Sequence, residues 1–107
     1  MNNYIFTSES VSDGHPDKVS DQISDALVDA GLKNGDETTR VAIETLVTTN
    51  HVTVAGEVKN FNVSKDEVDY IIRNKVKEIG YEQDGFHWEK LKIYNEIHSQ
   101  SGDIALG

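Results

Sequence analysis

The chain has 107 residues, 36% of them hydrophobic and 27% charged, a composition typical of one globular domain with one modest core. It contains no cysteine, which excludes disulfides and thiolate metal sites. The formal net charge of −9 argues against nucleic-acid and anionic-membrane partners, because such surfaces select for clustered Lys and Arg. No apolar run is long enough to cross a bilayer and no signal-peptide pattern opens the chain, so we expect a cytoplasmic protein.

The segment from Phe6 to Lys18, FTSESVSDGHPDK, marks the passage from a loop into a helix. Pro16 suits the first helical position, and apolar residues at helical spacing extend the predicted helix to about Lys33. The free N–H groups of a first turn attract phosphate oxygens. His15 and Asp17 are therefore placed to contact a polyphosphate, directly and through Mg²⁺, which prefers oxygen ligands. The alternative is that these residues only begin a helix.

From Thr39 to Lys59 the hydrophobic period changes to two, which predicts a β-hairpin with its turn at Thr49-Asn50. The expected register pairs Thr48 with His51, Glu44 with Ala55 and Ala42 with Glu57. Glu44 and Glu57 then become diagonal neighbours on one sheet face. That face is either solvent-exposed or, since both faces carry apolar residues, buried in an interface where cations pair with the carboxylates.

The second half of the chain predicts another helix and a last strand. Ser64 and Glu67 form a capping-box pattern, an apolar stripe follows, and Gly80 ends the helix. Phe86 and Trp88 are interpreted as core residues in a loop before the last strand. With a short strand at Tyr4 to Thr7, these elements give an α+β, two-layer βαββαβ domain.

The N-terminal motif resembles that of the S-adenosylmethionine synthase family, also called methionine adenosyltransferases. The resemblance continues in family order through five further segments, namely DQISDA (21–26), VAIETLV (41–47), VAGEV (54–58), EIGY (78–81) and QSGDIA (100–105). It implies that residues 1–107 form the N-terminal one of three related, intertwined domains, with a mainly antiparallel sheet and two helices. Residues 99–107 then begin the mobile active-site loop.

The resemblance also implies the chemistry. Family members join the sulfur of L-methionine to ATP, and the released triphosphate is hydrolysed to pyrophosphate and phosphate. His15 matches the catalytic, ATP-binding residue at the triphosphate, Asp17 a Mg²⁺ ligand and Glu44 a K⁺ ligand. Glu57 and Gln100 match methionine contacts. Members act as homodimers or homotetramers whose active sites are shared between subunits.

Some residues depart from the family pattern or match none of its roles. Gly102 stands where many members have Pro, and His51, His87 and His98 match no family role and are expected to be surface or core residues. The further Asp, Lys and Arg residues of the family site are absent, so we expect a fragment that is inactive alone. The alternatives are a non-catalytic dimerisation or regulatory module and a simple Mg²⁺-nucleotide-binding domain.

Overall fold

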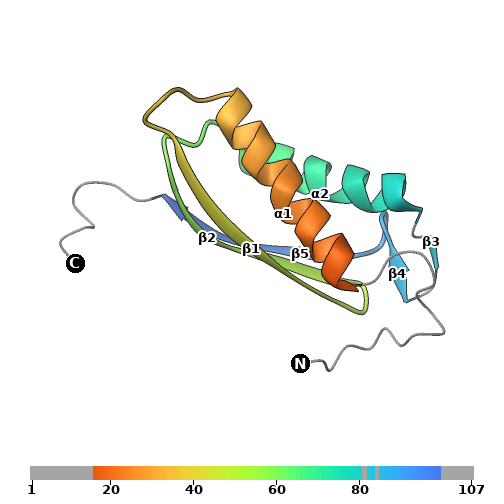
Figure 1. Ribbon diagram of the computed structural model, residues 1–107. Coiled ribbons are helices and arrows are strands. Elements are labelled where there is room, and N and C mark those ends of the chain that lie inside the picture. Colours follow the sequence, from red (N-terminus) through yellow and green to blue (C-terminus); the bar gives the residue numbers. More distant parts are fainter. Residues whose placement is uncertain (1–15, 81, 84, 100–107) are drawn as a thin grey trace.

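The computed structural model describes residues 16–80, 82–83 and 85–99 of the chain, which form two helices packed on one face of a sheet (Figure 1). The elements in chain order are α1 (Pro16–Lys33), β1 (Arg40–Thr48), β2 (His51–Lys59), α2 (Lys65–Ile79), β3 (Glu82–Gln83), β4 (Phe86–His87) and β5 (Lys92–Ser99). The predicted α+β, two-layer class is confirmed. The strand expected at Tyr4 to Thr7 lies outside the described residues.

Helix α1 begins at Pro16, as its fixed φ and missing N–H predict. Its buried stripe consists of Val19, Ile23 and Leu27, each at most 2% exposed. The opposite face carries exposed Asp21, Asp25 and Asp29. The 3.6-residue period in the sequence therefore determines which side of α1 packs on the sheet.

Strands β1 and β2 form the predicted antiparallel hairpin in the predicted register, from Arg40 opposite Lys59 to Thr48 opposite His51. Asn50 adopts φ +46° in the turn, a conformation that Asn tolerates better than most residues. Its backbone N–H donates to Gly85 O at 2.8 Å and its Oδ1 accepts from His87 N at 3.2 Å. These bonds attach the turn to the segment that leads into β5.

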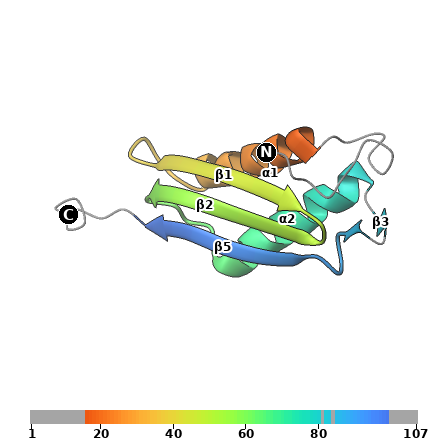
Figure 2. The same ribbon diagram turned by 90° about the horizontal axis from the view of Figure 1, so that it is seen from below.

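The sheet has the strand order β1-β2-β5, and β5 runs parallel to β2 (Figure 2). The described sheet is therefore mixed, with one antiparallel and one parallel pair, where the sequence led us to expect a mainly antiparallel one. The difference arises because α2 carries the chain across the layer between β2 and β5, and such a crossover returns the chain in a parallel direction. Strands β3 and β4 form a separate two-stranded ladder.

Helix α2 has the predicted caps at both ends. Ser64 Oγ accepts from the backbone of Glu67 at 3.1 Å while Glu67 Oε1 accepts from the backbone of Ser64 at 3.0 Å. Gly80 ends the helix at φ +100°, where it donates to the carbonyl groups of Val76 and Lys77. Val68, Ile72 and Val76 form its buried stripe.

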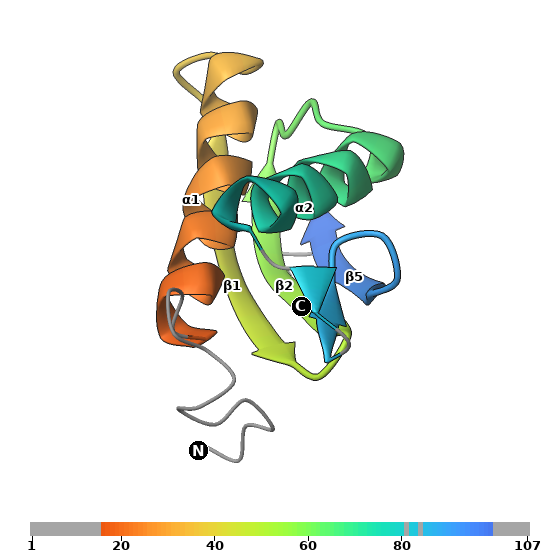
Figure 3. The same ribbon diagram turned by 90° about the vertical axis from the view of Figure 1, so that its right-hand side faces the viewer.

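The core lies between the helices and the covered face of the sheet (Figure 3). Phe86 is 1% exposed, so its assignment to the core is confirmed. Trp88 is partly buried against the core, with Lys77 Nζ 4.7 Å above the centre of its ring, a cation–π contact. Among the described residues, no helix is long and apolar enough to cross a membrane.

Candidate functional site

The face of the sheet turned away from the helices, which we call the open face, carries the described candidate site residues. It is formed by alternate side chains of β1, β2 and β5, because side chains of a strand point to opposite faces in turn. The residues at the centre of the open face are Ala42, Glu44 and Leu46 of β1, Thr53, Ala55 and Glu57 of β2, and Tyr94, Glu96 and His98 of β5. In this single chain the open face is exposed to solvent.

Glu44 and Glu57 lie as the sequence predicted. Glu44 is opposite Ala55, and Glu57 is opposite Ala42, so each carboxylate has a methyl group as its neighbour across the hairpin. The four residues border a shallow depression of about 490 Å³, together with Ile43 and Gly56. Small neighbours leave both carboxylates accessible to a ligand.

Gly56 is needed for this close approach of the two strands. It has φ +152°, and a Cβ atom at this position would overlap the carbonyl group of Ala42. A side chain here would push β1 and β2 apart. Gly56 pairs directly with Ile43, so the β1–β2 ladder continues through this position without a bulge.

Both carboxylates are exposed, and neither forms an ion pair or hydrogen bond with another side chain in the described part of the chain. Two large hydrophobic side chains accompany them, Leu46 at 53% exposure and Tyr94 at 45%. Of the two expectations for this face, solvent exposure therefore describes the single chain. Burial in an interface with cations stays a prediction.

Sequence reasoning missed two residues of the open face, Glu96 and His98. The parallel pairing of β5 places His98 directly opposite Glu57 and Glu96 directly opposite Ala55. His98 Nε2 lies 3.7 Å from Glu96 Oε1, and both side chains are largely exposed. Alternation along β5 would have placed the two residues on one face with Tyr94, but it does not reveal which strand they adjoin.

The remaining predicted site residues are placed only in part. His15 and Gln100 lie outside the described residues, and of Asp17 only the backbone, in the first turn of α1, is described. Helix α1 and strand β1 run in opposite directions, since Ser24 bonds to Thr45 and Gly31 lies beside Val41. The start of α1 is therefore at the end of the sheet that carries the β1–β2 turn (Figure 1).

Glu57 lies toward the other end of the sheet. From His51 at the turn to Glu57, strand β2 advances about 20 Å at roughly 3.3 Å per residue. Moreover, α1 packs on the covered face, while Glu57 is on the open face. The fold thus brings Glu44 and Glu57 together and places Glu57 far from the start of α1.

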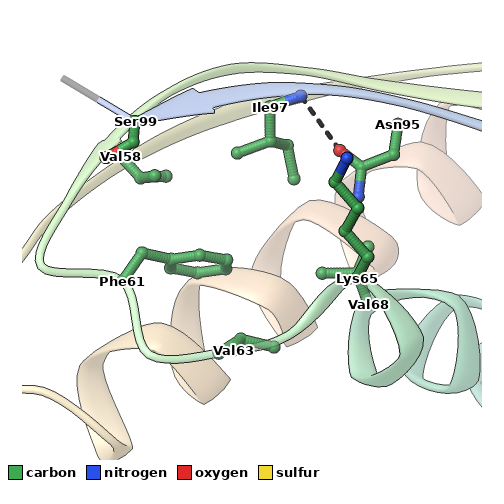
Figure 4. A pocket seen from close by; sticks show the side chains of 8 residues that line it. All are labelled: Val58, Phe61, Val63, Lys65, Val68, Asn95, Ile97 and Ser99. Carbon is green, nitrogen blue, oxygen red and sulfur yellow. Dashed lines mark hydrogen bonds between the residues drawn. The ribbon is translucent and has the colours of Figure 1, made fainter.

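A second cavity, of about 170 Å³, lies between the edge of β5 and the start of α2 (Figure 4). Its lining is mainly apolar and includes Phe61, Val63 and Ile97, and Lys65 is among its polar residues. Asn95 Oδ1 accepts from Ile97 N at 3.0 Å across its upper side. This cavity is on the covered side of the sheet and receives neither predicted glutamate.

No three His, Asp or Glu side chains gather closely enough to hold a metal ion within residues 16–80, 82–83 and 85–99. Glu44 therefore offers a single carboxylate, which fits one ligand of a cation site and not a whole site. A K⁺ site at Glu44 needs further oxygen atoms from other residues.

Comparison with known proteins identifies the family. The family model described as "S-adenosylmethionine synthetase, N-terminal domain" matches residues 3–102. The S-adenosylmethionine synthases of Rhodospirillum centenum and Paramagnetospirillum magneticum are 58% and 59% identical over 98% of this chain. In both cases the chain spans only 27% of the relative's length.

A solved structure shows the same likeness in three dimensions. It is described as an unusual S-adenosylmethionine synthetase from Campylobacter jejuni and superimposes with a TM-score of 0.73 and 38% sequence identity. The match covers 84% of this chain and 25% of that protein. The chain thus belongs to the S-adenosylmethionine synthetase family and corresponds to its N-terminal domain.

Proposed function

We propose that this domain supplies part of the active site of a methionine adenosyltransferase, within a protein of the length of its relatives. In the reaction, a lone pair of the methionine sulfur forms a bond to C5′ of ATP while the C5′–O bond breaks. The triphosphate leaves with the electron pair of that bond and is then hydrolysed to pyrophosphate and phosphate. Positioning and charge stabilisation dominate such a displacement.

The observation that carries this proposal is that Glu44 and Glu57, on the open face of a domain from this family, are both exposed and form no ion pair in the described part of the chain. We assign Glu57 to the ammonium group of L-methionine, with Gln100 as a second methionine contact. Glu44 would be one ligand of K⁺ and Asp17 one ligand of Mg²⁺. When bound, these cations supply positive charge, which a chain of net charge −9 lacks.

His15 is proposed to contact the triphosphate and to donate a hydrogen bond to the oxygen that departs from C5′. Such a donor lowers the barrier only if it lies close to the breaking bond. The start of α1 lies on the covered face at the turn end of the sheet, whereas Glu57 lies on the open face toward the other end (Figure 1). The reacting atoms of the two substrates must approach to about 3.5 Å. We therefore propose that each active site combines the N-terminal motif of one subunit with the open face of another, in a homodimer or homotetramer.

The test uses a full-length protein that contains this domain. Glu57→Gln should raise the KM for methionine roughly 30-fold or more, because an ion pair to a desolvated ammonium is lost. Glu44→Gln should mainly reduce the response of the rate to added K⁺. Glu89→Gln removes an exposed carboxylate outside the open face and serves as the control.

The two glutamates should thus have separable effects, each seen in its own titration. Identical behaviour of the two variants in the K⁺ and methionine titrations would contradict the assigned roles. A full-length protein that makes no S-adenosylmethionine, while the domain still associates with copies of itself, would favour the alternative of a dimerisation or regulatory module. Exposed Leu46 and Tyr94 are the observation that keeps this alternative open.

A further inference from the structure

We propose that His98 binds the carboxylate group of the amino-acid substrate whose ammonium group Glu57 binds. The inference rests on the proposed function, because it extends the methionine site assigned there. It starts from the parallel pairing of β2 and β5, which places Glu57 and His98 directly opposite each other on the open face. Neighbouring strands are about 4.8 Å apart, so the two side chains leave the sheet side by side.

This arrangement matches the chemistry of a free α-amino acid. Its ammonium and carboxylate groups are attached to the same carbon, so a site that binds both needs an acceptor and a donor about one strand spacing apart. Glu57 is acceptor only, whereas an imidazole offers N–H donors and carries a positive charge when protonated. On the other side of Glu57 the neighbour is Ala42, whose methyl side chain neither donates a hydrogen bond nor carries a charge.

Glu96 orients the imidazole for this role. Its Oε1 lies 3.7 Å from His98 Nε2, on the same strand and face, which leaves the second ring nitrogen available to a ligand. The other charged groups on this face are Glu44 and Arg40 on β1, Lys59 opposite Arg40 on β2, and Lys92 at the far end of β5. The helices pack on the opposite face and present no charge to His98.

Arg40 lies opposite Lys59 on β1, but its guanidinium donates to the backbone carbonyl groups of Glu37 and Thr39. Lys59 is the competing donor for the substrate carboxylate. It is exposed and shares the face of Glu57, but it lies about 6.7 Å along the same strand, farther than the strand spacing to His98. Its flexible stem also loses more side-chain entropy when it is fixed. His98 is therefore the better-placed partner, and Lys59 is the variant against which it must be compared.

The experiment measures the KM for L-methionine of the full-length enzyme at neutral pH. His98→Ala should raise this KM roughly tenfold, the value of one charge-assisted hydrogen bond, with little change in kcat. The inhibition constant of L-methioninol, which has the ammonium but no carboxylate, should stay unchanged.

Three further variants make the result decisive. His98→Arg should restore the KM, because Arg keeps charged N–H donors at this position. Lys59→Ala should change the KM much less than His98→Ala. If Lys59→Ala instead carries the loss, or if His98→Ala weakens methionine and methioninol equally, the proposal is wrong. Should Glu57→Gln leave the methionine KM unchanged, the proposed function itself fails, which separates the two failures.

Discussion

Ser24 Oγ lies 2.7 Å from Thr45 Oγ1, so that a hydroxyl of α1 is bonded to a hydroxyl on the covered face of β1. The bond joins the two layers of the domain at the middle of α1. Thr45 directly follows Glu44, whose side chain points to the opposite face. Together with the core between the layers, the bond fixes α1 against the strand that carries the proposed K⁺ ligand.

Replacing one partner of this pair should destabilise the domain. Thr45→Val keeps the shape but leaves the part-buried Ser24 hydroxyl without its partner, at a cost of about 1–2 kcal/mol in the free energy of unfolding. The double variant Ser24→Ala/Thr45→Val should cost less than the sum of the single variants, since no orphaned hydroxyl remains. Urea unfolding followed by circular dichroism measures all three values, and strict additivity would show that the hydroxyls are not coupled.

Gly56→Ala should destabilise the fold more than Gly80→Ala, although both glycines have positive φ. At Gly56 a Cβ would overlap the backbone of Ala42, which cannot move without opening the hairpin, and we expect a loss of about 2–3 kcal/mol. A Cβ added at Gly80 would have no neighbouring atom within 4 Å, so only the conformational cost of about 1 kcal/mol remains. Thermal unfolding of both variants tests this order, and equal losses would mean that β1 and β2 do not approach closely at Gly56.

Elements whose signals are local in the chain could be predicted from the sequence. Pro16 marks the start of α1, Ser64 and Gly80 mark the ends of α2, and the two-residue turn at Asn50 determines the hairpin register. Each depends on backbone preferences or hydrogen bonds within a few residues.

The neighbours of β5 could not be predicted in this way. Its alternation is equally compatible with pairing to β1 or to β2, in either direction, and the choice depends on how α2 packs across the sheet. For that reason the sequence identified Glu44 and Glu57 as a pair but left out His98 beside Glu57. The location of the start of α1, at the turn end of the sheet and on the face opposite Glu57, likewise follows from three-dimensional packing and not from local pattern.

Asp36 should make stability depend on pH in the acid range. Its Oδ1 accepts hydrogen bonds from the Thr38 hydroxyl at 2.6 Å, the Thr38 backbone at 2.7 Å and Asn60 Nδ2 at 2.9 Å. These bonds, first that from the Thr38 hydroxyl, lower the pKa of Asp36 below its ordinary value of 3.8. The folded state then binds fewer protons than the unfolded state at this carboxyl.

It follows that the contribution of Asp36 to stability is present above its unfolded pKa and is lost as the pH falls through its folded pKa. Asp36→Asn should therefore be less stable than the parent chain at pH 7, and the difference should shrink below about pH 4. The control is Glu37→Gln, which removes the adjacent exposed charge. A difference that stays constant from pH 7 down to pH 3 would contradict the role of these hydrogen bonds.

The open face should make this chain associate with copies of itself, through its exposed apolar residues. Leu46 and Tyr94 flank Thr53 in one row across the three strands, with 53% and 45% of their surfaces accessible in the single chain. Exposed hydrophobic side chains gathered on one face of a sheet are typical of an interface. Leu46→Asp should accordingly shift the chain toward monomers, because association would bury an unpaired charge.

The chain provides a matched control for this experiment. Leu32 is also 53% exposed but lies on α1, in the other layer, so Leu32→Asp should leave the association unchanged. Sedimentation velocity of the parent chain and both variants over a range of concentrations distinguishes the cases. If Leu32→Asp dissociates the chain while Leu46→Asp does not, the interface is on the helical layer, and an active site shared through the open face is excluded.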